Sequence, residues 1–245
     1  MKTLNIQLYS VKKSLEKDFE GTLEKLSDMG FDGVEFCGNY GGMSGDELSR
    51  LLERLGLDAA AAHVGLDEIE DDERFKFHAD MLKKIGCMYI VNPYVDLKSA
   101  DEAVQYGMRL EKAAEKCAKN GFLFAHHNHG SEIERKDENG ISYFDIMMSQ
   151  TELTLAEFDI FWLKHAGADI EQYLRQYSGK INLIHLKQMK DEVSKQSSSL
   201  DDGIIDINKT VELAEKFGTE TFIYENEQTE NELEAAEKSI KYFMK

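Results

Sequence analysis

The chain has 245 residues, of which 42% are hydrophobic and 31% charged, a balance typical of a folded globular protein and not of a disordered one. Its 29 basic residues face 47 acidic ones, and the formal net charge of −18 disfavours nucleic acids and anionic membranes as partners. No apolar run approaches the roughly 20 residues that a membrane span needs. The N-terminus turns polar too early for a signal peptide, and the three cysteines (Cys37, Cys87 and Cys117) lack metal-site spacing. We therefore expect a cytoplasmic protein with reduced thiols.

Eight short apolar runs recur along the chain, and the first residues of successive runs lie 26 to 40 positions apart. Each run is too short for a helix and is rich in Val, Ile, Leu, Phe or Ala, as expected of strands buried on both faces. In chain order the runs are 4–8, 33–36, 59–64, 88–91, 122–126, 155–161, 181–186 and 221–224.

The segments between these runs have the periodicity of amphipathic helices. Leu48, Leu51, Leu52 and Leu55, for example, follow the i, i+3, i+4, i+7 rule. Capping boxes predict helix starts at Ser44-x-x-Glu47, Ser99-x-x-Glu102 and Thr229-x-x-Glu232. Glycines that can adopt a left-handed turn predict helix ends at Gly30, Gly56, Gly86, Gly121 and Gly218.

Strict alternation of strand and helix predicts parallel strands joined by right-handed crossovers. Eight such units in about 250 residues indicate an α/β fold, a closed (β/α)₈ TIM barrel. An open doubly wound sheet is the alternative, but no Gly-x-Gly-x-x-Gly follows the first strand. We expect residues 1–245 to form a single domain.

A polar residue stands near the end of nearly every predicted strand, where TIM barrels carry their chemistry. Singly, such a residue is more often a solvated or hydrogen-bonded structural group, but eight at the same point of the repeat indicate a site. They are Gln7, Glu35, His63, Asn92, the run from His126 to His129 with Glu132, Asp159, His185 with Lys187, and Glu225 with Glu227.

The donor types near the last four predicted strands favour a divalent metal. Asp159, His185, Glu225 and the histidine run offer carboxylate oxygen and imidazole nitrogen, which suit Mn²⁺, Zn²⁺, Co²⁺ or Fe²⁺ better than Mg²⁺ or Ca²⁺. A network of histidines and carboxylates without metal is the alternative interpretation.

Alternation along a strand divides the histidine run into two pairs. His127 and His129 point to one side and His126 and Asn128 to the other. Since His126 directly follows the apolar strand body, we expect it to pack outward and the other pair to face the barrel interior.

Two further residues have open interpretations. Lys187 follows His185 by two positions and so points the same way, where it could stabilise an enolate or act as a general acid. It could equally be a surface lysine. Trp162, the only tryptophan, could form an apolar platform for a sugar ring or pack in the core.

Taken in order, several short motifs resemble those of the xylose-isomerase-like TIM barrels, the sugar phosphate isomerase/epimerase group. They are QLYSV at 7–11, GVEF at 33–36, AH at 62–63, HNHxxE at 127–132, DxxW at 159–162 with AGxD at 166–169, HLK at 185–187, GxxD at 203–206 and YE at 224–225. The match covers nearly the whole chain, and the ordered set is more specific than any one motif.

The resemblance implies Asp159, His185 and Glu225 as metal ligands. The fourth ligand would come from the fifth strand, where many relatives have Glu and this chain has His127, with Glu132 as the alternative. The implied catalytic residues are Glu225, Glu132 and Lys187. The implied substrate-binding residues are Gln7, Glu35, His63, Asn92, His129 and Trp162.

These residues imply a metal-dependent sugar, keto-sugar or sugar-phosphate isomerase or epimerase working through an enediolate. The alternatives are a metal-dependent hydratase or lyase acting on 3-keto sugars and a catalytically inactive sugar-binding barrel. We expect a small-molecule sugar as partner. The sequence leaves open which sugar it is, whether it carries phosphate, and whether the chain forms a homo-oligomer.

Overall fold

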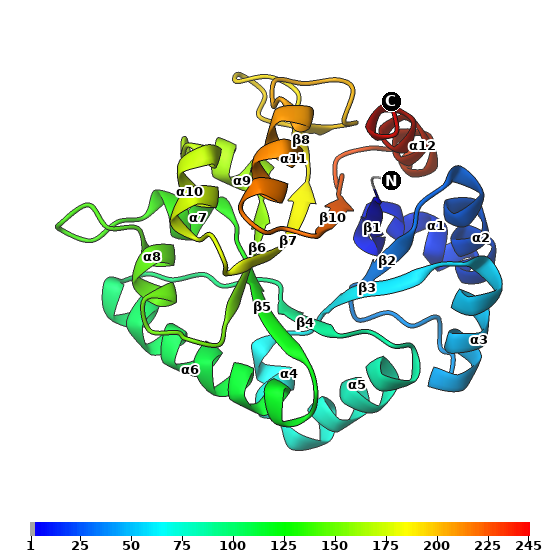
Figure 1. Cartoon of the computed structure of the whole chain (residues 1–245), viewed down its shortest axis with the longest axis horizontal. Coiled ribbons are helices and arrows are strands. Elements are labelled where there is room, and N and C mark those ends of the chain that lie inside the picture. Colours follow the sequence, from blue (N-terminus) through cyan, green and yellow to red (C-terminus); the bar gives the residue numbers. More distant parts are fainter. Residues whose placement is uncertain (1–2) are drawn as a thin grey trace.

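The computed structural model describes residues 3–245 and contains a closed barrel of eight parallel strands ringed by helices (Figure 1). The barrel strands are β1 (Asn5–Gln7), β2 (Gly33–Phe36), β3 (Asp58–His63), β4 (Tyr89–Asn92), β5 (Leu123–His127), β6 (Leu155–Asp159), β7 (Ile181–Leu186) and β10 (Thr221–Tyr224). Each pairs with its neighbours along the chain, and β1 pairs with β10 to close the barrel. The predicted (β/α)₈ barrel is therefore confirmed.

Helices cover the outside of the barrel, and the chain contains one further strand pair. The helices are the 3₁₀ helix η1 (Leu8–Val11) and α1 (Lys12–Lys17), α2 (Phe19–Met29), α3 (Gly45–Leu55), α4 (Leu66–Glu70), α5 (Asp72–Lys84), α6 (Ala100–Lys119), α7 (Gly130–Glu134), α8 (Tyr143–Met148), α9 (Ile160–His165), α10 (Ile170–Gln176), α11 (Ile207–Lys216) and α12 (Glu232–Phe243). After β7, the short strands β8 (Gln188–Met189) and β9 (Ser197–Ser198) form an antiparallel pair. Within residues 3–245, no helix is long and apolar enough to cross a membrane.

The expected helix boundaries are largely confirmed. Ser44 and Glu47 form the complete capping box of α3, and α2 and α3 end at Gly30 and Gly56 in the left-handed conformation. The box at Thr229 is wrong: α12 begins after Asn231, and the Glu232 carboxylate instead accepts hydrogen bonds from the backbone at the start of α1.

The sixth strand is shorter than its apolar run predicts. The run extends to residue 161, but β6 ends at Asp159, whose Oδ1 accepts hydrogen bonds from the backbone N–H groups of Phe161 and Trp162. This carboxylate caps α9 and thereby ends the strand.

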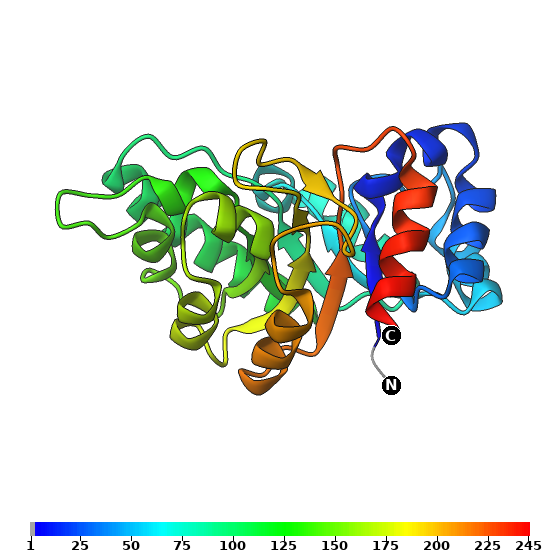
Figure 2. The same cartoon turned by 90° about the horizontal axis from the view of Figure 1, so that it is seen from above.

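The core has two parts. Most buried apolar side chains lie between the strands and the helices, whereas a small cluster fills the barrel interior. That interior cluster consists of Ala61, Val91, Ala125, Leu183 and Ile223. In Figure 2 the arrows of β1 (dark blue) and β10 (orange) point to the same face of the barrel. The interior cluster closes the barrel beneath that face, where the strands end.

Candidate metal centre and active site

The carboxyl ends of the barrel strands surround a cavity of about 500 Å³. It is lined by Gln7, Tyr9, Cys37, Gly38, His63, Gly65, Glu68, Pro93, Tyr94, His127, His129, Glu225 and Glu227. This is the face on which barrels of this type carry their chemistry.

Four buried residues at the strand ends could together hold a metal ion. His127, Asp159, His185 and Glu225 each offer one donor atom, and these atoms all lie within 4.8 Å of one another. The two nitrogen and two oxygen donors suit Zn²⁺, Mn²⁺, Co²⁺ or Fe²⁺. All four belong to the set expected from the sequence.

Asp159 supplies the observation that best fits a metal. Its Oδ1 caps α9, whereas its Oδ2 is fully buried without a hydrogen-bond partner and lies 4.0 Å from His127 Nε2. Burial raises the pKa of Asp159 to about 7, although Lys187 opposes the shift. A buried carboxylate oxygen with no partner is costly, and a cation at this point would remove that cost.

His185 contacts carboxylates on both of its ring nitrogens. Its Nδ1 lies 2.5 Å from Glu225 Oε2, and its Nε2 lies 2.7 Å from Glu35 Oε2. Burial alone would lower the pKa of His185, but Glu157 and Glu35 outweigh it and raise that pKa well above its usual range. His127 has the opposite balance, because burial and the neighbouring His185 hold its pKa well below its usual range.

Glu157 is a site residue that the sequence analysis missed. It is fully buried on β6, and its Oε2 lies 3.0 Å from His63 Nε2, 3.0 Å from His127 Nδ1 and 3.3 Å from His185 Nε2. For both candidate ligand histidines, this oxygen faces the ring nitrogen turned away from the metal cluster. Glu157 also belongs to a second group, with His63, His127 and His185, whose donor atoms lie within 4.8 Å of one another.

Glu35 and His63 extend the network of buried carboxylates and histidines around Glu157. Gln7 Nε2 donates a hydrogen bond of 2.8 Å to Glu35 Oε2, and Glu35 Oε1 lies 3.3 Å from His63 Nε2. Burial would lower the pKa of His63, but Glu35 and Glu157 beside it raise that pKa to about 10.

Lys187 is buried, so its interpretation as a surface lysine is wrong. Its ammonium pairs with Glu227, lies 3.5 Å from Glu225 Oε1 and lies 5.1 Å from the centre of the Trp162 ring. Trp162 in turn packs against His129, with ring centres 5.1 Å apart. Lys187 is therefore held between carboxylates and an aromatic wall, beside the candidate metal ligands.

The histidine run divides as strand alternation predicts. His126 packs outward against Phe144 of α8, whereas His127 and His129 line the cavity.

Asn92 and Glu132 are not among the described residues that line the cavity. Asn92 faces outward, where its Oδ1 accepts from Leu66 N and its Nδ2 lies 2.8 Å from His126 Nδ1. The buried Glu132 carboxylate accepts from His129 N and from the Ser131 hydroxyl at the start of α7. Asn92 thus supports the loop into α4 and Glu132 supports α7, while their substrate-binding and catalytic roles stay predictions.

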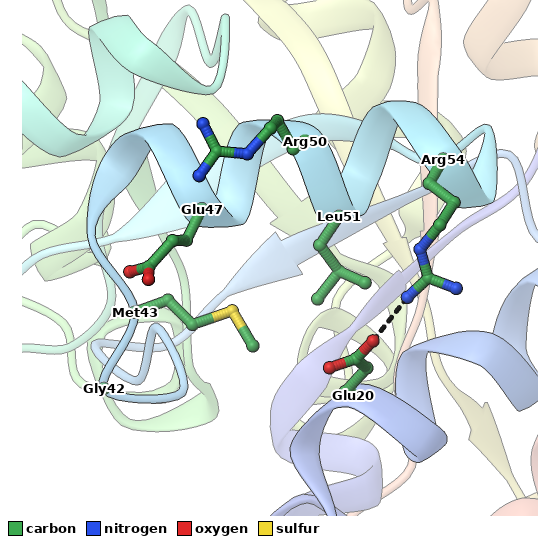
Figure 3. A pocket seen from close by; sticks show the side chains of 7 residues that line it. All are labelled: Glu20, Gly42, Met43, Glu47, Arg50, Leu51 and Arg54. Carbon is green, nitrogen blue, oxygen red and sulfur yellow. Dashed lines mark hydrogen bonds and ion pairs between the residues drawn. The ribbon is translucent and has the colours of Figure 1, made fainter.

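A second hollow of about 470 Å³ lies outside the barrel between α2 and α3 (Figure 3). Arg54, on α3, pairs there with Glu20 and Glu24 of α2, and all three side chains are about half exposed. In the described part of the chain, neither group of potential metal ligands includes a residue of this hollow. Its charges are paired on the surface, and we do not assign it a chemical role.

Comparison with known proteins identifies the class to which this fold and site belong. Residues 23–245 match the model of the xylose isomerase-like TIM barrel family, and the chain belongs to that family. Among curated proteins, none matches the sequence.

Solved structures show the same fold at low sequence identity. A sugar phosphate isomerase/epimerase from Parabacteroides distasonis ATCC 8503 is 21% identical with a TM-score of 0.85, covering 100% of this chain and 98% of its own. The IOLI protein, solved with a binding zinc atom, is 18% identical with a TM-score of 0.78 over 99% and 97% of the two chains. The probable 3-DHS dehydratase AsbF from Bacillus anthracis is 13% identical with a TM-score of 0.78 over 100% and 99%.

Proposed function

We propose that this chain is a metal-dependent isomerase or epimerase of a sugar or keto sugar. The observation that carries the proposal is the cluster of His127, Asp159, His185 and Glu225, with a buried Asp159 oxygen that has no hydrogen-bond partner among the described residues. The zinc in the IOLI structure and the name of the Parabacteroides protein support it.

The four clustered residues would hold the metal at the floor of the cavity. When bound, a divalent cation stabilises negative charge on the oxygens of an adjacent carbonyl and hydroxyl group. The carboxylates of Asp159 and Glu225 together balance its two positive charges.

The chain itself supplies the groups that move protons. Glu225 lines the cavity, and although burial opposes its ionisation, Lys187 and His185 hold its pKa well below its usual range. It is therefore the carboxylate placed to take a proton from a carbon next to the carbonyl. Lys187, 3.5 Å from Glu225 and paired with Glu227, provides a positive charge beside the developing oxyanion.

A lyase or dehydratase is the second candidate. The specific observation in its favour is the buried ion pair of Lys187 and Glu227, which could protonate a departing hydroxyl group. The dehydratase named among the similar structures has the same fold.

Deuterium exchange tests the proposal and separates the candidates. The zinc- or manganese-loaded protein is incubated in D₂O with a panel of ketoses and aldoses, and products are followed by NMR and mass spectrometry. An isomerase or epimerase gives an isomer that carries deuterium at the reacting carbon, whereas a dehydratase gives a product lighter by one water. Glu225→Gln should abolish the exchange. A sugar that binds without deuterium exchange, with no exchange for any other sugar of the panel, would instead indicate an inactive binding barrel. Failure to bind stoichiometric metal would refute the metal centre.

A further inference from the structure

The charged groups in the walls of the cavity are mainly carboxylates. Its lining includes the carboxylates of Glu68, Glu225 and Glu227, and among the lining residues that the structure describes there is no lysine or arginine. Glu35 and Glu157 add two more buried carboxylates directly below. Asp159 and Glu225 would balance a divalent metal. Lys187 and His63 pair with Glu227 and Glu35, so the carboxylates of Glu68 and Glu157 keep the loaded cavity negative.

The two lysines near the cavity are already engaged. Lys187 is buried between Glu227, Glu225 Oε1 at 3.5 Å and Asp159 Oδ2 at 3.9 Å, so its charge is compensated. Lys12 lies near the rim, with Nζ 3.6 Å from the centre of the Tyr9 ring. It offers one solvent-accessible charge on a flexible stem, which differs from the converging donors of a phosphate site.

The helix starts near the cavity are also unfavourable for a phosphate. Barrels of this type often bind phosphate at backbone N–H groups that follow the last two strands. Here Asp206 Oδ1 accepts from Lys209 N at the start of α11, whereas the first turn of α12 carries the two acidic residues Glu232 and Glu234. At α4, the N–H groups of Gly65 and Leu66 likewise donate to the side chains of Glu68 and Asn92. Side chains of the protein therefore take the place of a ligand anion at α11 and α4, and at α12 the acidic residues of the first turn repel one.

The rim has instead the groups that bind an uncharged sugar. Tyr9 and Tyr94 are 41% and 55% exposed at the cavity and present flat apolar faces to the C–H groups of a sugar ring. Glu68 and His129 offer acceptors and donors for hydroxyl groups.

We propose that the substrate is an uncharged, unphosphorylated sugar or polyol-derived carbonyl compound, and that phosphate esters are excluded by the carboxylates around the cavity. The inference rests on the proposed function of the same site. It differs from the substrate that the names of several structural relatives suggest. A phosphate dianion placed among these carboxylates would lose affinity through like-charge repulsion, because no lysine or arginine among the described lining residues offsets it.

Matched pairs of sugars test the proposal on the zinc-loaded full chain. D-Fructose is compared with D-fructose 6-phosphate, and D-ribulose with D-ribulose 5-phosphate, after unbound zinc has been removed. Trp162 is the only tryptophan of the chain and packs against His129, so its fluorescence reports occupancy of the cavity. We expect the uncharged member of any pair that binds to do so at least about tenfold more tightly. Tighter or equal binding of the ester would overturn the inference and leave the proposed function standing, whereas failure of every sugar to bind would overturn both.

Two variants identify the cause of the preference. Glu68→Gln removes one rim carboxylate, so the ratio between the two affinities should shrink by several-fold. Lys12→Ala removes the lysine at the rim, and the ratio should stay the same within about twofold. An unchanged ratio of the two affinities in Glu68→Gln would contradict the electrostatic explanation. Loss of phosphate-ester binding in Lys12→Ala alone would also contradict it.

Discussion

Replacing Glu157 with glutamine should weaken metal binding, although Glu157 is not among the four candidate ligands. Its Oε2 faces Nδ1 of His127 and Nε2 of His185, at 3.0 and 3.3 Å. Three histidines outweigh the effect of burial and hold the pKa of Glu157 well below its usual range, so the group is an ionised acceptor and the facing nitrogens must donate. That arrangement leaves the opposite nitrogen of each ring free for a metal.

The expected magnitude follows from the number of ligands that Glu157 orients. Loss of a carboxylate behind one ligand histidine typically costs 10- to 100-fold in metal affinity. Because one oxygen serves two of the four candidate ligands here, we expect the upper end, about 100-fold or ~2.7 kcal/mol. The amide also turns a donor toward imidazole N–H groups, so the metal-free protein should lose roughly 2 kcal/mol of stability.

Zinc affinity is measured by competition with a chromophoric chelator, and the ligand field by the visible spectrum of the Co²⁺-loaded protein. Glu35→Gln is the matched comparison, because Glu35 contacts His185 and His63 but, in the described contacts, not His127. We expect about a tenfold loss for this variant. A purely structural role for Glu157 would lower the melting temperature and leave the Co²⁺ spectrum unchanged. Wild-type zinc affinity in Glu157→Gln would refute the reasoning. So would a stoichiometry that falls from two metals to one, because Glu157 would then itself be a ligand, in the second group with His63, His127 and His185.

Three further predictions concern other parts of the molecule. His127→Ala should lose metal at least about 100-fold, whereas Glu132→Gln should retain it; equilibrium dialysis with metal analysis decides, and the reverse result would return the fifth-strand ligand to Glu132. Cys37 lines the cavity, but burial, Glu35 and Glu225 raise its pKa to about 11, so iodoacetamide should label it slowly at pH 8 and faster as the pH rises. Fast labelling at pH 8, detected by mass spectrometry, would contradict this. Gly107→Ala should destabilise the fold by about 1–3 kcal/mol, because its new Cβ would lie 2.2 Å from a backbone carbonyl of α8. Gln105→Ala, at an exposed position of the same helix, serves as control in thermal unfolding.

The barrel could be predicted from the sequence because the repeat is expressed several times in independent ways. Apolar runs, glycines at helix ends and helical periodicity all give the same strand and helix order. The details that the sequence did not reveal concern which partner a carboxylate takes. Glu232 is expected to cap its own helix but binds the backbone of α1. Glu132 is expected at the cavity, but its carboxylate accepts a hydrogen bond at the start of its own helix, α7. Chain position alone does not determine which partner a carboxylate takes.

The direction of each strand-end residue follows a rule that the sequence did contain. Val91, Ala125 and Ile223 belong to the interior cluster, so residues two positions further along the chain also face inward. His127 and Glu225 satisfy this rule and line the cavity, whereas residue 92 follows an inward residue directly and must face outward.

The same rule explains why Glu157 was overlooked and how it could have been found. Glu157 lies in the middle of the apolar run 155–161, so the pattern assigns it to the body of the strand and not to the strand end. Asp159 lies two residues later, so if one faces the interior the other must do so as well. A Glu-x-Asp pair on a fully buried parallel strand has no solvent to reach on either face, and both carboxylates need partners inside the barrel. In this chain the partners of Glu157 are imidazoles from β3, β5 and β7. Glu157 orients His127 and His185, and Asp159 completes the metal-ligand group with these two histidines and Glu225.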